Sequence, residues 1–261
     1  NAISALDREI CSLVDGNVQI GNEVSDLEVA AAQLGKPNLV GEHFRRSLNT
    51  LPPDHVLWAG IYNKAGECVC TVAAKYEAVQ GRSLERHMTE YFERAFEAED
   101  GGHVSLKRGS AAFSGLASGP FVYVGEGHVR PDMRGHNLLG LLQRLLILSA
   151  YYRWKPKLIY GFMRPDKIRK GYHTNWGYTT ARPSGFIWDK KPAQRDLHDL
   201  YFVGLASEGI CHLTEDPLKA GLYRRHENSK IEIARRKSSG TAEQDAGSEV
   251  LATAPLRTAD L

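Results

Sequence analysis

The chain has 261 residues, of which 42% are hydrophobic and 25% charged, as is usual for a globular protein. Its formal net charge of +2 gives no reason to expect nucleic acid as a partner. The sequence has no run of about 18 apolar residues for a membrane-spanning helix, and no signal peptide opens it. We therefore predict a cytoplasmic protein that binds neither nucleic acid nor membranes, and we leave a homodimer open.

The first half of the chain predicts helices followed by a hairpin. Apolar residues recur at helical spacing from Ala2 to about Leu51, so residues 1–51 are expected to form helices that pack on a sheet. Residues 55–62 and 67–74 read as two antiparallel strands joined by a turn. A helix is expected over 83–98 with Ser83 as its N-cap, inside an insertion at about 78–119.

The second half predicts a strand, a basic turn and a long apolar helix. The strand covers 121–129, the turn 130–137 and the helix begins at Leu138, with Gln143 and Arg144 expected on a solvent-facing edge. Further strands are expected at 157–163, 185–188 and 199–205, with a short helix between the first two. A strand–helix–strand unit makes its strands parallel neighbours, whereas the hairpin is antiparallel. These elements predict an α/β (α+β) fold with a mixed, mostly antiparallel central sheet flanked by helices, in a domain over 52–225.

The end of the sequence differs in composition. No aromatic residue follows Tyr223, and small, polar and charged residues dominate up to Leu261. Such a segment buries too little apolar surface to offset the entropy of ordering, so we predict a disordered tail over 226–261.

The turn between the central strand and the long helix predicts an anion site. The first backbone N–H groups of a helix have no partner within the helix, and the positive end of the helix dipole lies beside them. The alternative is that Arg134 and Gly135 form an ordinary turn before a core helix.

This stretch resembles a known family. Residues 129–135, with Arg134 as the first matching position, are similar to the segment entering the pyrophosphate loop of the GNAT acyltransferase superfamily. Asn137 and Leu139 stand where that family usually has Gly and Gly/Ala, and Asn tolerates left-handed backbone better than most residues. The ending Tyr172–Tyr178 also resembles the family's aromatic approach to Gly-Phe or Gly-Tyr.

The resemblance covers about residues 50–206 and implies a GNAT-like fold with splayed central strands and an acyl-CoA co-substrate. The implied donor-binding residues are Val129, Arg134, Gly135, His136, Asn137, Leu138, Leu139 and Gly140. No metal is expected, because the four cysteines lack the spacing of a zinc site.

Transfer to an amine needs a base and an acid. Glu126 is the first choice as base, with His128 as its rival, because both lie on the central strand beside Gly125 and Gly127. The alternative for Glu126 is a structural ion pair with a Lys or Arg. The resemblance places the acid near His173 or Tyr172, and packing of aromatic side chains at a helix end is the alternative there.

The sequence therefore predicts an N-acyltransferase that moves an acyl group, expected to be acetyl, from acyl-CoA to a small-molecule amine or a peptide. Two alternatives stay open. The donor can carry a longer acyl chain on CoA or on an acyl carrier protein, or the chain can be a regulatory module that binds acyl-CoA without turnover.

Overall fold

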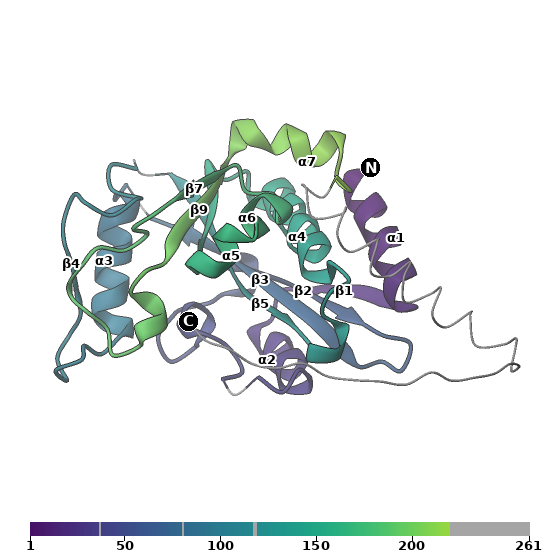
Figure 1. Cartoon of the computed structure of the whole chain (residues 1–261), viewed down its shortest axis with the longest axis horizontal. Helices are drawn as coiled ribbons and strands as arrows, with labels where there is room; N and C mark the ends of the chain where they lie inside the picture. Colours follow the sequence, from purple (N-terminus) through teal and green to yellow (C-terminus); the bar gives the residue numbers. More distant parts are fainter. Residues whose placement is uncertain (37, 80, 117–118, 220–261) are drawn as a thin grey trace, which may run out of the picture. The chain divides into compact units, whose positions relative to one another are not determined.

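The computed structural model describes residues 1–36, 38–79, 81–116 and 119–219 (Figure 1). Its main element is a seven-stranded sheet in the order β1-β2-β3-β5-β6-β9-β7. All neighbouring strands are antiparallel except β5 and β6, which are parallel. The strands are β1 (Asn17–Gly21), β2 (Val56–Tyr62), β3 (Cys68–Ala78), β5 (Pro120–Val129), β6 (Leu158–Met163), β7 (Thr180–Arg182) and β9 (Tyr201–Ala206). The predicted mixed, mostly antiparallel sheet flanked by helices is confirmed.

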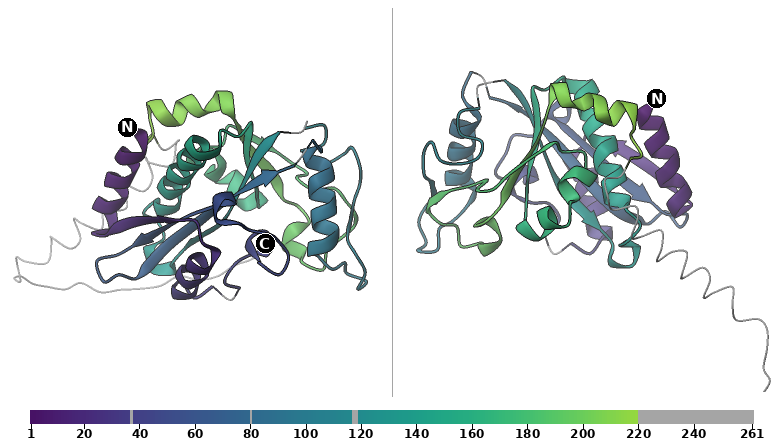
Figure 2. Two further views of the ribbon diagram at one scale, coloured as in Figure 1. Left: turned by 180° about the vertical axis from the view of Figure 1, so that it is seen from behind. Right: turned by 45° about the horizontal axis from the view of Figure 1, so that its top comes forward.

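Helices cover both faces of this sheet (Figures 1 and 2). Helices α1 (Ala2–Val14) and α4 (Leu138–Trp154) pack on one face, together with the short α7 (Cys211–Glu215). Helices α2 (Val24–Gln33) and α3 (Leu84–Ala95) pack on the opposite face. Two short helices, α5 (Pro165–Arg169) and α6 (Tyr172–Asn175), follow β6 in the chain. The 3₁₀ turns are η1 (Glu42–Phe44), η2 (Pro53–His55), η3 (Pro131–Met133), η4 (Arg195–Leu197) and η5 (Ser207–Ile210).

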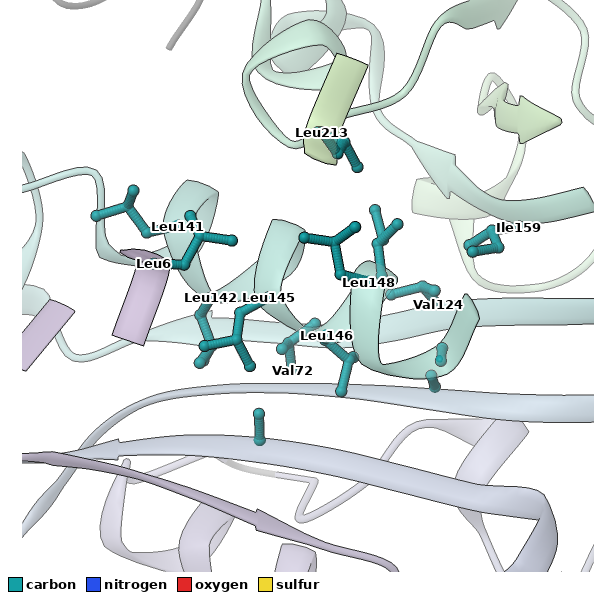
Figure 3. Packing of buried hydrophobic residues seen from close by; sticks show 14 of the residues in the cluster. Leu6, Val72, Val124, Leu141, Leu142, Leu145, Leu146, Leu148, Ile159 and Leu213 are labelled. Atoms are coloured by element: carbon teal, nitrogen blue, oxygen red, sulfur yellow. The ribbon is translucent and has the colours of Figure 1, made fainter. Parts of the chain in front are cut away.

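Helix α4 lies at the centre of the largest hydrophobic cluster (Figure 3). Its leucines pack against Val72 and Val124 of the sheet, Leu6 of α1 and Leu213 of α7. A helix that is apolar on all sides is stable only when it is buried on all sides. The expectation that Gln143 and Arg144 face solvent is wrong, because both side chains are buried. Gln143 donates to the Tyr178 hydroxyl, and Arg144 donates to oxygens of Asn175 and Pro217.

Two strand predictions need correction. β1 was not predicted; it is a five-residue edge strand whose one partner among the described strands is β2. The strand predicted at 185–188 is not part of the main sheet, where β7 pairs with β9 instead. Phe186 packs in the aromatic cluster under α3, which explains the apolar character of this segment without a strand. Residues from Trp188 onward form β8 (Trp188–Lys190), which pairs with β4 (Ser105–Leu106) in a small second sheet.

Other predictions are confirmed or lie outside the described residues. The hairpin is β2–β3, and the hydroxyl of Ser83 accepts a hydrogen bond from the Arg86 N–H as the N-cap of α3. Among the described residues, no helix is long and apolar enough to cross a membrane. The predicted disordered tail, 226–261, lies outside the described residues.

Candidate functional site

The central parallel strands separate partway along their length. β5 and β6 pair at three positions, Phe121–Leu158, Val122–Ile159 and Tyr123–Tyr160, and then continue without pairing to each other. A cleft of about 260 Å³ lies between their diverging ends. It is lined by residues 123–127 of β5, residues 161–163 of β6, and Gln143, Arg164, Lys167, Trp176, Tyr178 and Val203. The splayed pair of central strands implied by the sequence resemblance is therefore present.

A β-bulge sits in the β5 wall of this cleft. Gly125 lies opposite Ala73 and His128 lies opposite Thr71, so Glu126 and Gly127 together face the single residue Val72. Glu126 adopts a φ of 59°, in the left-handed region that non-glycine residues seldom occupy. Bulges and backbone strain of this kind concentrate at functional sites, where they aim a side chain.

The bulge places the Glu126 carboxylate among groups from the N-terminal segment. Lys36 Nζ lies 2.7 Å from Glu126 Oε2, and the Gly41 N–H donates to Oε1 at 2.9 Å. The Glu126 side chain is 9% exposed and that of Lys36 is 15% exposed. The ion pair considered from the sequence is therefore present, in a carboxylate that also lines the cleft.

His128 lies close to the same charges. Burial lowers its pKa below 6.5, the positive charges of Lys36 and Arg134 lower it further, and the negative charge of Glu126 opposes them. The half-buried imidazole is consequently neutral at pH 7 and able to accept a proton.

The N-terminus of α4 is built as the sequence suggested. Asn137 is its N-cap residue, with φ 57° and ψ 18° in the left-handed region. Its side chain does not cap the helix; instead Oδ1 accepts a hydrogen bond from Asn175 Nδ2 at 2.6 Å. Because the Asn137 side chain is engaged elsewhere, the first N–H groups of α4 remain available to a ligand.

Leu139 and Gly140 occupy the first turn of α4. A Cβ added to Gly127 would lie 3.4 Å from the Leu139 methyl groups, so this leucine packs over the glycine of the bulge. A Cβ added to Gly140 would lie 2.4 Å from Asn137 Oδ1 and 2.6 Å from Asn175 Nδ2. The hydrogen bond between the two asparagines therefore requires glycine at position 140.

The remaining donor-loop residues lie between β5 and α4. Val129 is half-buried, whereas Arg134, Gly135 and His136 are exposed, and Gly135 has a φ of 95°. Arg134 has no ion-pair partner within the described residues, whereas its neighbour Arg130 pairs with Glu67 and Asp132.

The predicted acids Tyr172 and His173 lie on α6, and neither lines the cleft. The Tyr172 ring packs near Trp176, with centroids 5.8 Å apart, and burial lowers the pKa of His173. Sequence reasoning missed Tyr178 as a site residue: it lines the cleft, and its hydroxyl accepts a hydrogen bond from Gln143 Nε2 at 2.9 Å. Burial raises the pKa of Tyr178 above its usual 10, so the phenol stays protonated.

A second polar cluster was also missed. On the α3 side of the sheet, Glu77 lies 3.3 Å from Lys75 Nζ and 3.4 Å from His87 Nε2, and it accepts a hydrogen bond from the Tyr160 hydroxyl. Burial raises the pKa of Glu77, but the charge of Lys75 and the contacts with His87 hold it below the usual value. Lys75 is two residues from Glu77 on β3 and so shares its face, but His87 on α3 and Tyr160 on β6 are brought to Glu77 by packing that the sequence alone does not reveal. The cluster does not line the cleft.

Comparison with known proteins finds likeness in fold. No family model matches the sequence, and no curated protein matches it. The structure is similar to an aminoglycoside acetyltransferase, AAC(6')-Ib, solved with coenzyme A and kanamycin, at 12% identity and a TM-score of 0.45, over 76% of this chain and 99% of that one. It is also similar to Arabidopsis thaliana NAA60 in complex with a bisubstrate analogue, at 11% identity and a TM-score of 0.41, over 73% and 99% of the two chains. Such distant likeness concerns the fold alone, so the function has to be argued from the site.

Proposed function

We propose that the chain is an acyl-CoA-dependent N-acyltransferase of the GNAT superfamily that moves an acyl group, most simply acetyl, to an amine. One observation carries the proposal. The cleft between the diverging ends of β5 and β6 adjoins a helix whose first N–H groups are not capped by Asn137. A cleft with both apolar and polar lining residues beside an anion-binding helix end suits a donor with a thioester at one end and phosphates further along.

For the donor, the proposed contacts are the N–H groups of Leu138, Leu139 and Gly140, with Arg134 and His136 on the exposed side of the loop. Arg134 has no ion-pair partner among the described residues, so its guanidinium is available to screen phosphate charge. Val129, Gly135 and Asn137 set the path of the backbone. The volume of the cleft, about 260 Å³, is enough for a short acyl group and its thioester.

For the base, the proposal keeps Glu126, with His128 as the rival. Glu126 is supported by its place in the wall of the cleft and by the bulge that aims its carboxylate. The Lys36 ammonium already forms an ion pair with this carboxylate, so the position suits an amine. His128 is supported by its lowered pKa, since a neutral imidazole can take a proton at pH 7.

For the acid, Tyr178 joins Tyr172 and His173 as a candidate. Tyr178 lines the cleft, and its raised pKa keeps the phenolic proton in place at neutral pH. Because Gln143 donates to this oxygen, the phenolic proton is left to point at another acceptor. A departing thiolate in the cleft is such an acceptor.

Turnover tests the proposal. The chain is incubated with acetyl-CoA and a panel of small-molecule and peptide amines, and release of the free CoA thiol is measured. We expect thiol release with at least one amine, and a loss of about 100-fold or more in Glu126→Gln. Glu67→Gln, which breaks the exposed ion pair of Arg130 outside the cleft, is the matched control and should retain turnover. A variant Glu126→Gln that keeps full turnover would assign the base to another residue.

A second candidate function has one observation in its favour. The Glu126 carboxylate is already paired with the Lys36 ammonium, so it is not free to act as a base. This fits a regulatory module that binds acyl-CoA without transferring the acyl group. Stabilisation by acetyl-CoA with no thiol release across the amine panel would favour that module over the enzyme.

A further inference from the structure

Lys36 differs from the exposed lysines of the described chain in burial and in its partner. It follows α2 in the chain, its side chain is 15% exposed, and its Nζ lies 2.7 Å from Glu126 Oε2. The side chains of Lys64 and Lys219 are 82% and 79% exposed, and they pair with aspartates on the surface. Burying an ammonium costs free energy unless a carboxylate compensates, so the Glu126 partner holds Lys36 at this place.

Lys75 offers a direct comparison. Its side chain is 9% exposed and its Nζ lies 3.3 Å from the buried Glu77, so burial and pairing resemble those of Lys36. The difference lies in the carboxylates. Glu126 lines the cleft between β5 and β6, whereas Glu77 does not. Of these two largely covered lysines, Lys36 is the one whose partner borders the cleft proposed for the donor.

We propose that Lys36 is itself an acyl acceptor, so that the chain acylates its own lysine before or between reactions with external amines. This inference rests on the proposed function, because the acyl group comes from the acyl-CoA in the cleft. The geometry supports it in one further way: the backbone N–H of Gly41 also holds the carboxylate, at 2.9 Å, so Glu126 stays in place when Lys36 changes its charge.

The reaction is an ordinary aminolysis of a thioester. Glu126 Oε2 takes one proton from the Lys36 ammonium, and the freed amine attacks the carbonyl carbon of the thioester. A C–N bond forms, the C–S bond breaks, and the thiolate takes up a proton as CoA leaves. The products are an amide on Lys36, free CoA and one proton released to water. Proximity makes the step effectively unimolecular, which favours Lys36 over lysines elsewhere on the chain.

Acylation changes the site that carries it. The amide on Lys36 is neutral, so the ion pair with Glu126 is lost while the hydrogen bond from Gly41 remains. The carboxylate is then open to the ammonium of an external acceptor.

Peptide mapping by mass spectrometry tests the inference on the full chain. One sample is treated with acetyl-CoA and a second with acetic anhydride, which acetylates lysines according to their exposure. With acetyl-CoA we expect Lys36 to be modified before Lys64, and Lys75 to stay unmodified. With the anhydride we expect Lys64 to be modified before Lys36. The rate constant at Lys36 should not change with protein concentration, and Glu126→Gln should lower it about 100-fold or more.

The outcomes separate this inference from the proposed function. Modification of Lys64 before Lys36 by acetyl-CoA, or equal modification of Lys36 and Lys75, would overturn the inference. Thiol release with an external amine while Lys36 stays unmodified would also overturn it and leave the proposed function standing. If acetyl-CoA neither stabilises the chain nor releases its thiol in the presence of amines, both the inference and the proposed function are overturned. Lys36→Arg keeps a cation on Glu126 but lacks the amine nucleophile, so it should fold, bind acetyl-CoA and show no acetylation in this peptide.

Discussion

Asn175 Nδ2 donates a hydrogen bond to Asn137 Oδ1 at 2.6 Å, and so the last residue of α6 fixes the N-cap residue of α4. Arg144 reinforces this contact from inside α4, since its guanidinium donates to the backbone oxygen of Asn175 at 2.7 Å and to the side-chain Oδ1 at 3.2 Å. Buried polar networks of this kind are rigid when every member is satisfied. The proposed anion site therefore depends on residues 38 positions apart in the sequence.

The left-handed backbone at Asn137 can be tested with two substitutions. Both Asn137→Gly and Asn137→Ala remove the hydrogen bond with Asn175, at a cost of about 1 kcal/mol. Alanine adds about 1–2 kcal/mol because its Cβ is strained at a φ of 57°, whereas glycine is not. Urea unfolding should thus show Asn137→Ala to be the less stable variant. Equal stability of the two variants would contradict the left-handed conformation.

Replacing Gly140 with alanine should destabilise the protein, whereas the same change usually stabilises a helix. Replacing an interior helix glycine with alanine ordinarily stabilises a protein by about 1 kcal/mol. At position 140 the new methyl group would lie 2.4 Å from Asn137 Oδ1, so the asparagine contact has to break. We expect Gly140→Ala to lower the free energy of unfolding and to weaken acetyl-CoA binding, measured by urea unfolding and by calorimetry. A stabilised Gly140→Ala variant with unchanged binding would show that the contact does not shape the site.

The Gln143–Tyr178 hydrogen bond can be measured with a double-mutant cycle. Tyr178→Phe leaves the buried Gln143 amide without this acceptor, which costs about 1–3 kcal/mol. Adding Gln143→Leu removes the unpaired amide, so the double variant should lose less stability than the two single losses added together. If the losses are additive, the two side chains are not coupled. Tyr178→Phe should also slow thiol release, whereas Tyr201→Phe, outside the cleft lining, should not.

Acid lability is expected from His43. Burial lowers its pKa well below 6.5, and the charges of Lys75 and His87 lower it further against the effect of Glu77. The unfolded chain takes up a proton at this residue as the pH falls through 6.5 while the folded chain does not, so stability decreases on acidification. The ring stacks on Tyr123 at 3.7 Å and its Nδ1 has no hydrogen-bond partner among the described residues, so His43→Phe should fold.

The measurement is the free energy of unfolding at several pH values between 7 and 5. His43→Phe should flatten the dependence by up to about 1.4 kcal/mol per pH unit, the contribution of one proton. An unchanged slope would show that the His43 imidazole takes up its proton in the folded state as readily as in the unfolded one.

Local patterns made the main elements predictable. The hairpin of β2 and β3, the strand–turn–helix of β5 and α4, and the left-handed Asn137 each follow from residues that are close in sequence. β1 escaped prediction because it is short and lies at the sheet edge, with residues such as Ile20 exposed. The segment around Phe186 resembles a strand in composition, but its hydrophobicity serves packing under α3.

The site was predictable in part. Its strand and helix could be named, but the partners of its polar groups are remote in sequence: Lys36 is 90 residues from Glu126, and Gln143 is 35 from Tyr178. Arg144 looks like a surface residue by type, yet the carbonyl oxygens of Asn175 and Pro217 make its burial possible. Such contacts are set by how the elements pack, which no periodicity records.

The central claim is that the cleft and the α4 N-terminus bind an acyl-CoA, and thermal unfolding with added ligand tests it most directly. A ligand that binds the folded chain alone stabilises it by about 2.7 kcal/mol at 100 times its dissociation constant. We predict that acetyl-CoA raises the melting temperature in a concentration-dependent way, and that it does so less in Gly140→Ala. No shift with acetyl-CoA, a long-chain acyl-CoA or CoA would contradict the account.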